Sequence, residues 1–376
     1  MELQTGRIVS GENFRGRKEL LLQIKTYMEI NQSIVLVAPR RYGKSSIIKK
    51  VLDNSKKYKS IEIDLMKVYN KRDLAEKIIE ETYKLVGINN VWEYTKKQSY
   101  QTMQVITNIL KSVKISFEEA EVGVSFDLSS GKDDDAFLLH ALALPDKIAQ
   151  RLGIRIIFAI DELGEIRNLK EWEKILDVMR SVFQTVEKTN FIFAGSQYSL
   201  MNKIFTDKNS PFFRFAEVLN VPTMRAEEFK GFFEEVFKKK NISLYKGFTE
   251  DLVAISGGIP YYIIKIGQEV FVNALIKNKM NTYPVHICKG ALARYYKEES
   301  YFMSEMNKIK GRKNYYQVIK ILSQKENPYK ELKSKGLLKQ NIVKILQDLQ
   351  DDGMIEKRGT DYRIIDPFMN RYIKKM

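Results

Sequence analysis

The sequence predicts an α/β domain built on a parallel sheet, followed by an all-helical region and a small C-terminal unit of three helices and a two-stranded ribbon. Short apolar runs that end in polar residues alternate with helical stretches up to about residue 222, as in parallel sheets covered on both faces. Helical periodicity alone then continues to about residue 307, and the ribbon turns at a glycine near the end. We therefore expect domains at 1–222, 223–307 and 308–376.

Composition narrows the class of protein. No apolar run approaches the ~18–20 residues that a membrane span needs, and the polar N-terminus lacks a signal-peptide pattern, so we expect a cytoplasmic protein. The single cysteine, Cys288, rules out an internal disulfide and argues against structural zinc. His140 and His286 are too few for a histidine-based metal centre. The net charge of +16 favours polyanionic partners, although a solvated lysine-rich surface is the alternative.

The stretch Val35–Ile48, VLVAPRRYGKSSII, has the pattern of a strand, a phosphate-binding loop and a helix N-terminus. It fits G-x-x-x-x-G-K-[ST], except that Ala38 replaces the first glycine. In such a loop the backbone N–H groups and the helix dipole favour a polyphosphate. Lys44 would reach the β- and γ-phosphates, and Ser45 would ligate Mg²⁺. A chance G-K-S in a lysine-rich chain is the alternative. The residues expected to contact ATP are Pro39, Arg40, Arg41, Tyr42, Gly43, Lys44, Ser45 and Ser46.

A second apolar run, Ile156–Ile160, ends in Asp161-Glu162. Ligand chemistry in open α/β sheets lies at the carboxyl ends of the strands. Asp161 would hold Mg²⁺ through its water shell, and Glu162 would orient or deprotonate an attacking water. An acidic turn without chemistry is the alternative, which the earlier G-K-S loop disfavours. A further strand, Asn190–Ser196, would place Ser196 beside the γ-phosphate.

Other segments are predicted from periodicity. Arg214 stands among aromatics in the loop before Val221 and is either a packed surface residue or an arginine that reaches a γ-phosphate. The remaining predicted elements are a strand at Ser60–Leu65, a short helix at Val105–Leu110, a hairpin at Val113–Phe117 and Glu121–Phe126, and helices at Leu20–Ile30, Arg72–Val86, Ala136–Leu152 (interrupted at Pro145), Trp172–Glu187 and Thr223–Lys238, with linkers at Tyr283-Pro284 and Lys308–Lys313.

The C-terminal unit has the pattern of a winged helix-turn-helix. Helices at Tyr316–Ile321, Pro328–Ser334 and Leu338–Leu349 precede strands at Met354–Lys357 and Tyr362–Ile365. From Glu305 onward there are 17 Lys/Arg and 9 Asp/Glu, so we expect duplex DNA as a partner. A winged helix that contacts only proteins is the alternative. The third helix would offer Lys335, Lys339, Gln340, Asn341 and Lys344 to a major groove, and the wing would offer Lys357, Arg358 and Arg363 to phosphates.

Together these stretches resemble the archaeal-type ATPases of the STAND branch of the AAA+ superfamily, which are P-loop ATPases followed by a helical lid and a winged helix. The resemblance covers nearly the whole chain. It is carried by NFRGRKEL, APRRYGKSS, IFAIDELGEI, FIFAGS, SPFFR, SGGIPYYI and DLQDDGMIEKRGTDYRIIDPF, in the family's order.

The resemblance implies further roles. The segment Phe14, Arg15, Gly16 and Arg17 would frame the adenine, and Ser196 falls on the sensor position. Arg214 is similar to the family's finger-like arginine, in its own subunit or in a neighbour's. Gly258-Ile259-Pro260 is similar to the lid motif that contacts nucleotide, so Gly258 and Pro260 would couple the nucleotide to domain rotation. Ala38 departs from the usual glycine. Because the sequence shows no repeat array after the winged helix, a large signalling assembly is not expected.

The sequence therefore predicts a cytoplasmic ATPase switch that binds ATP or ADP with Mg²⁺ and hydrolyses ATP slowly, moving a winged helix that binds DNA. A second copy of the chain or another protein remains open as a partner. Two alternatives remain: a DNA-binding regulator that holds nucleotide without hydrolysing it, and a protein–protein adaptor whose winged helix never meets DNA.

Overall fold

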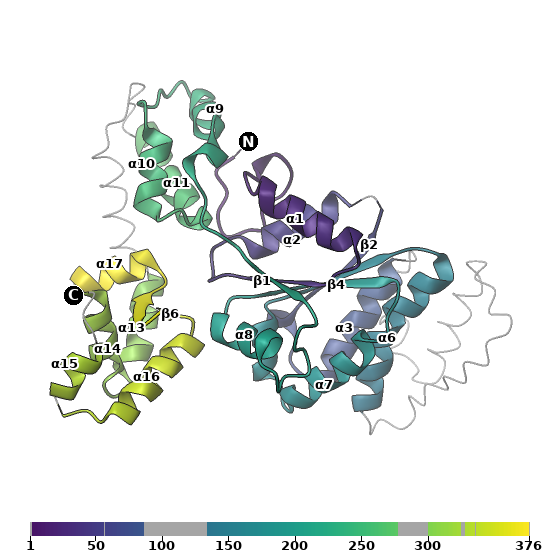
Figure 1. Cartoon of the computed structure of the whole chain (residues 1–376). Helices are drawn as coiled ribbons and strands as arrows, with labels where there is room; N and C mark the ends of the chain where they lie inside the picture. The colour runs from purple at the N-terminus through teal and green to yellow at the C-terminus, as the bar shows by residue number, and fades with distance from the viewer. Residues whose placement is uncertain are drawn as a thin grey trace, which may run out of the picture.

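The computed structural model describes residues 2–55, 57–85, 134–276, 300–324, 328–334 and 336–375. Several predicted features lie outside these residues: the helix at 105–110, the hairpin at 113–126, the linker at 283–284, His286, Cys288 and Lys335. The described part of the chain forms a sheet domain, a helical lid and a C-terminal unit (Figure 1).

The sheet domain is built on five strands in the order β2-β3-β4-β1-β5, and all its pairings are parallel. The strands are β1 (Ile34–Val37), β2 (Lys59–Asp64), β3 (Ile156–Asp161), β4 (Thr189–Gly195) and β5 (Glu217–Asn220). This arrangement confirms the predicted parallel α/β domain. Because the strands are parallel, their carboxyl ends meet at one edge, where the predicted phosphate loop and acidic pair both lie.

Helices cover both faces of the sheet, so its central strands are buried throughout (Figure 1). One face packs against α1 (Lys18–Glu29) and α2 (Lys44–Asp53) through residues such as Ile24 and Ile48. The other face packs against α3 (Lys71–Lys84), α6 (Asp134–Leu152), α7 (Trp172–Phe183) and α8 (Tyr198–Thr206). Phe158 and Phe193 are fully buried there, and burial of such a side chain contributes about 1.5–3 kcal/mol. This rigid core fixes the strand ends that carry the site.

The lid follows β5 and contains η4 (Ala226–Phe229), α9 (Phe232–Lys238), α10 (Phe248–Ser256) and α11 (Pro260–Ile276). The single helix predicted over Thr223–Lys238 is wrong. Lys230 and Gly231 break it, because Gly231 has a φ of 76°, in the left-handed region that ends regular helices. The interruption predicted at Pro145 is also wrong, because α6 runs through that residue.

The C-terminal unit contains α13 (Ser300–Lys310), α14 (Tyr315–Ser323), α15 (Pro328–Ser334), α16 (Lys339–Asp351), an antiparallel pair β6 (Ile355–Arg358) and β7 (Asp361–Ile364), and α17 (Pro367–Lys375). It shares one hydrophobic core with the lid. The ring of Tyr262 on α11 stacks on Phe368 of α17 with 4.0 Å between centroids. The boundary expected at 307 stays a prediction, and its position lies within α13.

The helices in the described part of the chain include none with the length and hydropathy of a membrane span.

Candidate functional site

The phosphate loop joins the carboxyl end of β1 to α2. Its positive φ angles occur at Arg41 (75°) and at Gly43 (84°), the N-cap of α2. Ala38, where the template has glycine, is buried and does not adopt a positive φ. An alanine therefore fits the first position of this loop without strain.

Lys44 is buried in the centre of the site, with 4% of the residue exposed. Its ammonium donates hydrogen bonds to the carbonyls of Ala38, at 2.9 Å, and Pro39, at 3.3 Å. Burial lowers the pKa of Lys44, the carboxylates of Glu162 and Asp161 raise it, and the nearby Arg40 lowers it. The loop carbonyls thus fix a desolvated ammonium in a position where it can bind a phosphate.

Asp161 is the last residue of β3 and pairs in register with Asp64 at the end of β2. The Asp161 carboxylate accepts a hydrogen bond from the N–H of Glu162, at 2.9 Å. Burial raises the pKa of Asp161, and the nearby Ser45 hydroxyl opposes that shift. Since the two predicted metal ligands lie near each other at this edge of the sheet, the residues present fit a Mg²⁺ whose coordination phosphate oxygens and water would complete.

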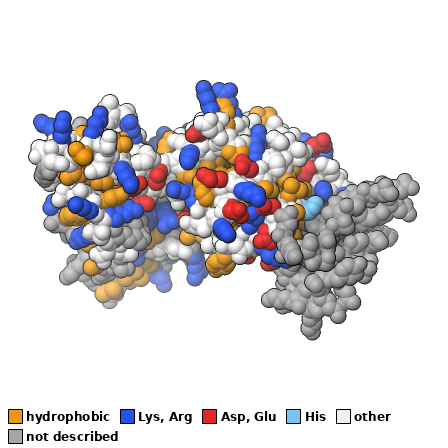
Figure 2. Space-filling model, turned by 90° about the horizontal axis from the view of Figure 1, so that it is seen from below, with side chains coloured by type: hydrophobic (Ala, Val, Ile, Leu, Met, Phe, Trp, Pro, Cys, Tyr) orange, Lys and Arg blue, Asp and Glu red, His pale blue; other side chains and the backbone are white. Residues whose placement is uncertain are grey.

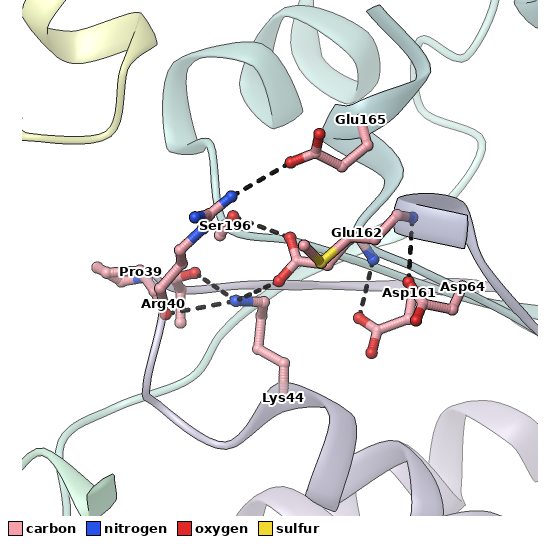
Figure 3. A network of polar contacts seen from close by, with 10 residues as sticks. Pro39, Arg40, Lys44, Asp64, Asp161, Glu162, Glu165 and Ser196 are labelled. Atoms are coloured by element: carbon pink, nitrogen blue, oxygen red, sulfur yellow. Dashed lines mark hydrogen bonds and ion pairs between the residues drawn. The ribbon is translucent and has the colours of Figure 1, made fainter. Parts of the chain in front are cut away.

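Glu162 is held by two partners, as Figure 3 shows. The Ser196 hydroxyl donates to Oε2 at 2.8 Å, and the Lys44 ammonium lies 3.9 Å from Oε1. Glu162 has a φ of 50°, which is rare for a residue with a side chain, and it is the N-cap of η3 (Leu163–Asn168). The structure thus brings together five predicted residues from three segments: Lys44 and Ser45 after the phosphate loop, Asp161 and Glu162 at the end of β3, and Ser196 after β4.

The two loop arginines point to different partners. Nη2 of Arg40 lies 3.3 Å from Oε1 of Glu165, in η3 (Figure 3). Arg41 leaves the sheet domain altogether. Its Nη1 forms an ion pair with Asp366, at 3.2 Å, and a hydrogen bond with the hydroxyl of Tyr262. The phosphate loop is therefore in direct contact with the lid and with the C-terminal unit.

The segment Phe14–Arg17, predicted to contact the adenine, connects the phosphate loop to the start of the lid. Arg17 is buried and donates to the carbonyls of Pro222 and of Tyr42, the latter at 3.3 Å. Gly16 has a φ of 64°, and a Cβ at this position would clash with the side chain of Glu228. Phe14 packs on the core under α2, and the Arg15 guanidinium lies over the Phe232 ring. The Ser46 hydroxyl accepts from the N–H of Val9 at 3.0 Å, so it binds the N-terminal segment.

The lid turn closes the site from the other side. Gly258 has a φ of 72°, and its carbonyl accepts from the N–H of Met224 at 2.7 Å. Pro260 begins α11, and the N–H of Tyr261 lies 3.4 Å from the carbonyl of Arg41. A cleft of about 1170 Å³ separates the phosphate loop and this turn from the wing, and its lining includes Ala38, Tyr42, Thr223, Ile259, Lys357 and Arg363.

Arg214 does not join the other predicted site residues. Glu217 begins β5 and pairs with Ile34 at the start of β1, so Arg214 lies at the amino edge of the sheet. The phosphate loop follows Val37 at the opposite, carboxyl edge. The Arg214 guanidinium is exposed and lies over the ring of Phe213. Arg214 is therefore not part of this chain's own phosphate site.

The predicted DNA-contacting residues separate into two groups. Four are exposed at the start of α16: Lys339, Gln340, Asn341 and Lys344. Lys357 lines the cleft instead, with its ammonium over the Tyr362 ring. Arg358 lies in β6, and Lys335 lies outside the described residues. Seen from below, Lys and Arg side chains are spread over the C-terminal part among hydrophobic ones (Figure 2).

Sequence reasoning missed the partners of the loop arginines, Glu165, Tyr262 and Asp366, and the contact between Ser199 and Asp351 at 2.8 Å. It also missed Glu228, which accepts from the N–H of Arg17. These residues carry no local motif. The available signal was the pair of arginines inside the phosphate loop, which require acidic partners when partly buried.

A family of ATPase domains found predominantly in Archaea matches residues 14–266. The chain belongs to this family. No curated protein matches this archaeal-type ATPase in sequence.

Solved structures show its fold. The Walker-type ATPase paby2304 of Pyrococcus abyssi is 18% identical, with a TM-score of 0.69 and 99% of both chains covered. The ORC2 protein of Aeropyrum pernix, in ADPNP-ADP complexes, is 9% identical with a TM-score of 0.57 and 97% of each chain covered. The ORC1 protein of Aeropyrum pernix, in complex with DNA, is 12% identical with a TM-score of 0.50, covering 97% of this chain and 94% of that one. The archaeal-type ATPase thus has the AAA+-like fold with a helical region and a C-terminal β-hairpin.

Proposed function

We propose that this archaeal-type ATPase is a molecular switch of the STAND type that binds MgATP and hydrolyses it slowly to ADP and phosphate. Lys44 binds the β- and γ-phosphates, while Ser45 and Asp161 hold the Mg²⁺ and its water shell. Glu162 accepts the proton of the attacking water, and Ser196 contacts the γ-phosphate. The backbone of the phosphate loop from Pro39 to Ser46 surrounds the phosphates.

The state of Glu162 is the observation that carries this proposal. Its carboxylate is shared between Ser196 and Lys44, two groups that a γ-phosphate would also attract. Phosphate binding would therefore draw both partners away and leave the carboxylate free to accept a proton from water. A purely structural acidic turn needs neither contact with the loop lysine nor the strained backbone at Glu162.

Nucleotide contacts from the frame and the lid complete the proposed site. The segment Phe14–Arg17 borders the phosphate loop through the bond from Arg17 to Tyr42. In the turn Gly258–Pro260, Ile259 lines the same cleft as the loop, and the carbonyl of Gly258 accepts from the N–H of Met224 after β5. We infer that both segments contact the nucleotide base or ribose and that lid movement follows nucleotide exchange.

The C-terminal unit is the proposed output of the switch. It touches the site at Arg41, through Asp366, and at Ser199, whose hydroxyl donates to Asp351 at 2.8 Å. Ser199 is the second residue of α8 and lies three residues after Ser196. A change at either nucleotide-facing segment would therefore reach the winged helix directly.

Duplex DNA is the proposed ligand of the winged helix. The exposed start of α16 presents lysines and amides to solvent, and the ORC1 protein with a similar fold was solved with DNA. A duplex affinity that falls steeply with salt supports DNA binding. No binding at low salt leaves a winged helix that contacts only proteins.

The test of the ATPase is steady-state hydrolysis by the wild-type chain and by Glu162→Gln, together with ATP binding by both. Hydrolysis that depends on Mg²⁺ and is lost in Glu162→Gln supports the proposal. A wild-type chain that binds ATP without turnover is instead a regulator that holds its nucleotide.

A further inference from the structure

Arg40 lies among the groups proposed to meet the γ-phosphate. It occupies the third position of the phosphate loop, counted from Ala38. Figure 3 shows it extending from Pro39 toward Glu165, on the side of the loop where Ser196 and Glu162 meet. The Lys44 ammonium donates to the carbonyl of Pro39, the residue before Arg40, at 3.3 Å, and the charge of Arg40 acts to lower the pKa of Lys44. Arg40 is therefore a second cation near the phosphate-binding Lys44.

Of the three arginines that belong to the loop or bond to it, Arg40 is the one with a largely exposed side chain, 58%. Arg17 is buried against two backbone carbonyls, and the Arg41 side chain, 17% exposed, is held by Tyr262 and Asp366. Arg40 has its ion pair with Glu165, whose other oxygen accepts from Asn168 at 2.7 Å. Exposed ion pairs contribute little stability, so this contact is easily exchanged.

We propose that Arg40 leaves Glu165 when MgATP binds and contacts the γ-phosphoryl oxygens, so that the chain supplies its catalytic arginine in cis. This inference rests on the proposed ATP hydrolysis. The planar guanidinium can bind two phosphoryl oxygens at once. Because the γ-phosphate carries more negative charge than one carboxylate, its interaction with Arg40 should be more favourable than that of Glu165.

The step is a phosphoryl transfer. A bond forms between the water oxygen and the γ-phosphorus, and the bond from that phosphorus to the β,γ-bridging oxygen breaks. Its electron pair stays on ADP, and Glu162 takes the proton of the water. Arg40 offsets the negative charge that develops on the transferring group. Arg214, at the opposite edge of the sheet, cannot do this within one chain.

The test compares Arg40→Ala, Arg40→Lys and Arg72→Ala. Arg72 is a matched control, because it also bridges two elements by an exposed ion pair, to Asp134 at 3.4 Å with 44% of its side chain exposed. We expect Arg40→Ala to lower kcat by roughly 10³-fold or more while ATP affinity changes less than about threefold. Arg40→Lys, which keeps the charge but loses the fork, should fall in between, and Arg72→Ala should match the wild type.

Two further measurements separate the alternatives. Affinity for ADP with aluminium fluoride, which mimics the transferring phosphoryl group, should drop in Arg40→Ala while affinity for ADP stays the same. Mixing Arg40→Ala with Glu162→Gln chains should restore no activity if the arginine acts in cis. Restored activity, an Arg40→Ala kcat within threefold of wild type, or an equal loss of ADP affinity overturns the inference.

The inference and the proposed function fail in different ways. Wild-type turnover that is lost in Glu162→Gln but kept in Arg40→Ala removes the role of Arg40 alone. A wild-type chain without turnover removes the proposed hydrolysis. The fluoride complex then still decides on Arg40: unchanged affinity in Arg40→Ala overturns the contact, and lost affinity supports it.

Discussion

Arg41 of the phosphate loop and Asp366, the residue before α17, form an ion pair with 3.2 Å between Nη1 and Oδ2 across 325 residues of sequence. The Tyr262 hydroxyl bonds to both, so the loop, the lid and the C-terminal unit meet at one point. The segment that would surround the phosphates therefore also holds the proposed output domain.

Neutralising Asp366 should loosen this contact without unfolding α17. Asp366→Asn keeps the oxygen that accepts from the N–H groups of Phe368, at 2.8 Å, and Met369, at 3.1 Å. It removes the charge that faces a partly buried arginine, which costs about 1–3 kcal/mol. Hydrogen exchange in the phosphate loop and α17 should become faster. The control Asp352→Asn, whose pair with Arg312 is exposed and lies within the C-terminal unit, should leave the loop unchanged. Equal exchange in both variants would contradict the contact.

Gly258→Ala should lower the free energy of unfolding by more than backbone strain alone would. A Cβ there would lie 2.7 Å from the Met224 carbonyl and 2.9 Å from Thr223. Gly247→Ala is a matched control, because Gly247 also has a positive φ, 93°, but its Cβ would meet nothing within 4 Å. The control should lose about 1–2 kcal/mol from strain. Gly258→Ala should lose at least about 1 kcal/mol more, with weaker ATP binding. Urea unfolding and ATP titration measure both. Equal losses of stability in Gly258→Ala and Gly247→Ala would mean that the lid turn can shift to make room for the Cβ, which would contradict the prediction.

Asp161→Asn should stabilise the nucleotide-free chain at neutral pH. Burial raises the pKa of Asp161 above its usual 3.8, so the folded chain binds this proton more tightly than the unfolded chain. Ionising Asp161 therefore costs stability as pH rises above about 3.8. The gain in Tm over wild type should grow between about pH 4 and 7. Asp177→Asn, on an exposed face of α7, is the control. A gain that does not vary with pH would contradict the burial argument.

The same variant tests the metal role. MgATP should raise the Tm of the wild-type chain, since a ligand at 100 times its Kd stabilises by about 2.7 kcal/mol. Asp161→Asn should lose most of that rise, because the amide carries no charge for Mg²⁺. A rise as large as in wild type would exclude Asp161 from the metal site.

Replacing both Lys339 and Lys344 by alanine should weaken duplex binding and flatten its salt dependence. Each phosphate contact contributes about 0.9 to the slope of log affinity against log salt, so the slope should fall by about 2. Lys240→Ala, an exposed lysine of the lid, should leave the slope unchanged. Fluorescence anisotropy from 50 to 200 mM salt provides the measurement. An unchanged slope in the double variant would place DNA elsewhere.

The sequence predicted those parts of the site that follow from local order. Lys44 follows the buried strand β1 in a recognisable motif, Asp161 ends the buried strand β3, and parallel strands bring their carboxyl ends together. Ser196 was predicted for the same reason. The strand β5 was missed, because EVLN is short and only partly buried.

The ion pairs could not be read from the sequence, because they depend on how distant elements pack. Nothing near Arg41 indicates that its partner is Asp366, and nothing near Arg40 indicates Glu165. Arg214 lies at the amino edge of the sheet, because Glu217 at the start of β5 pairs with Ile34 at the start of β1. A one-dimensional pattern gives the order of elements, while strand register and packing decide which side chains meet.

The proposed ATPase site is tested most directly by ATP turnover at saturating MgATP in wild type and Glu162→Gln, with ATP affinity measured for both. Loss of a general base lowers rates by about 10²–10⁴-fold, so Glu162→Gln should show at least a 10²-fold lower kcat. Its ATP affinity should stay within about threefold of wild type, since Lys44 and the loop still hold the phosphates. A Glu162→Gln variant that hydrolyses ATP at the wild-type rate would contradict the proposed site.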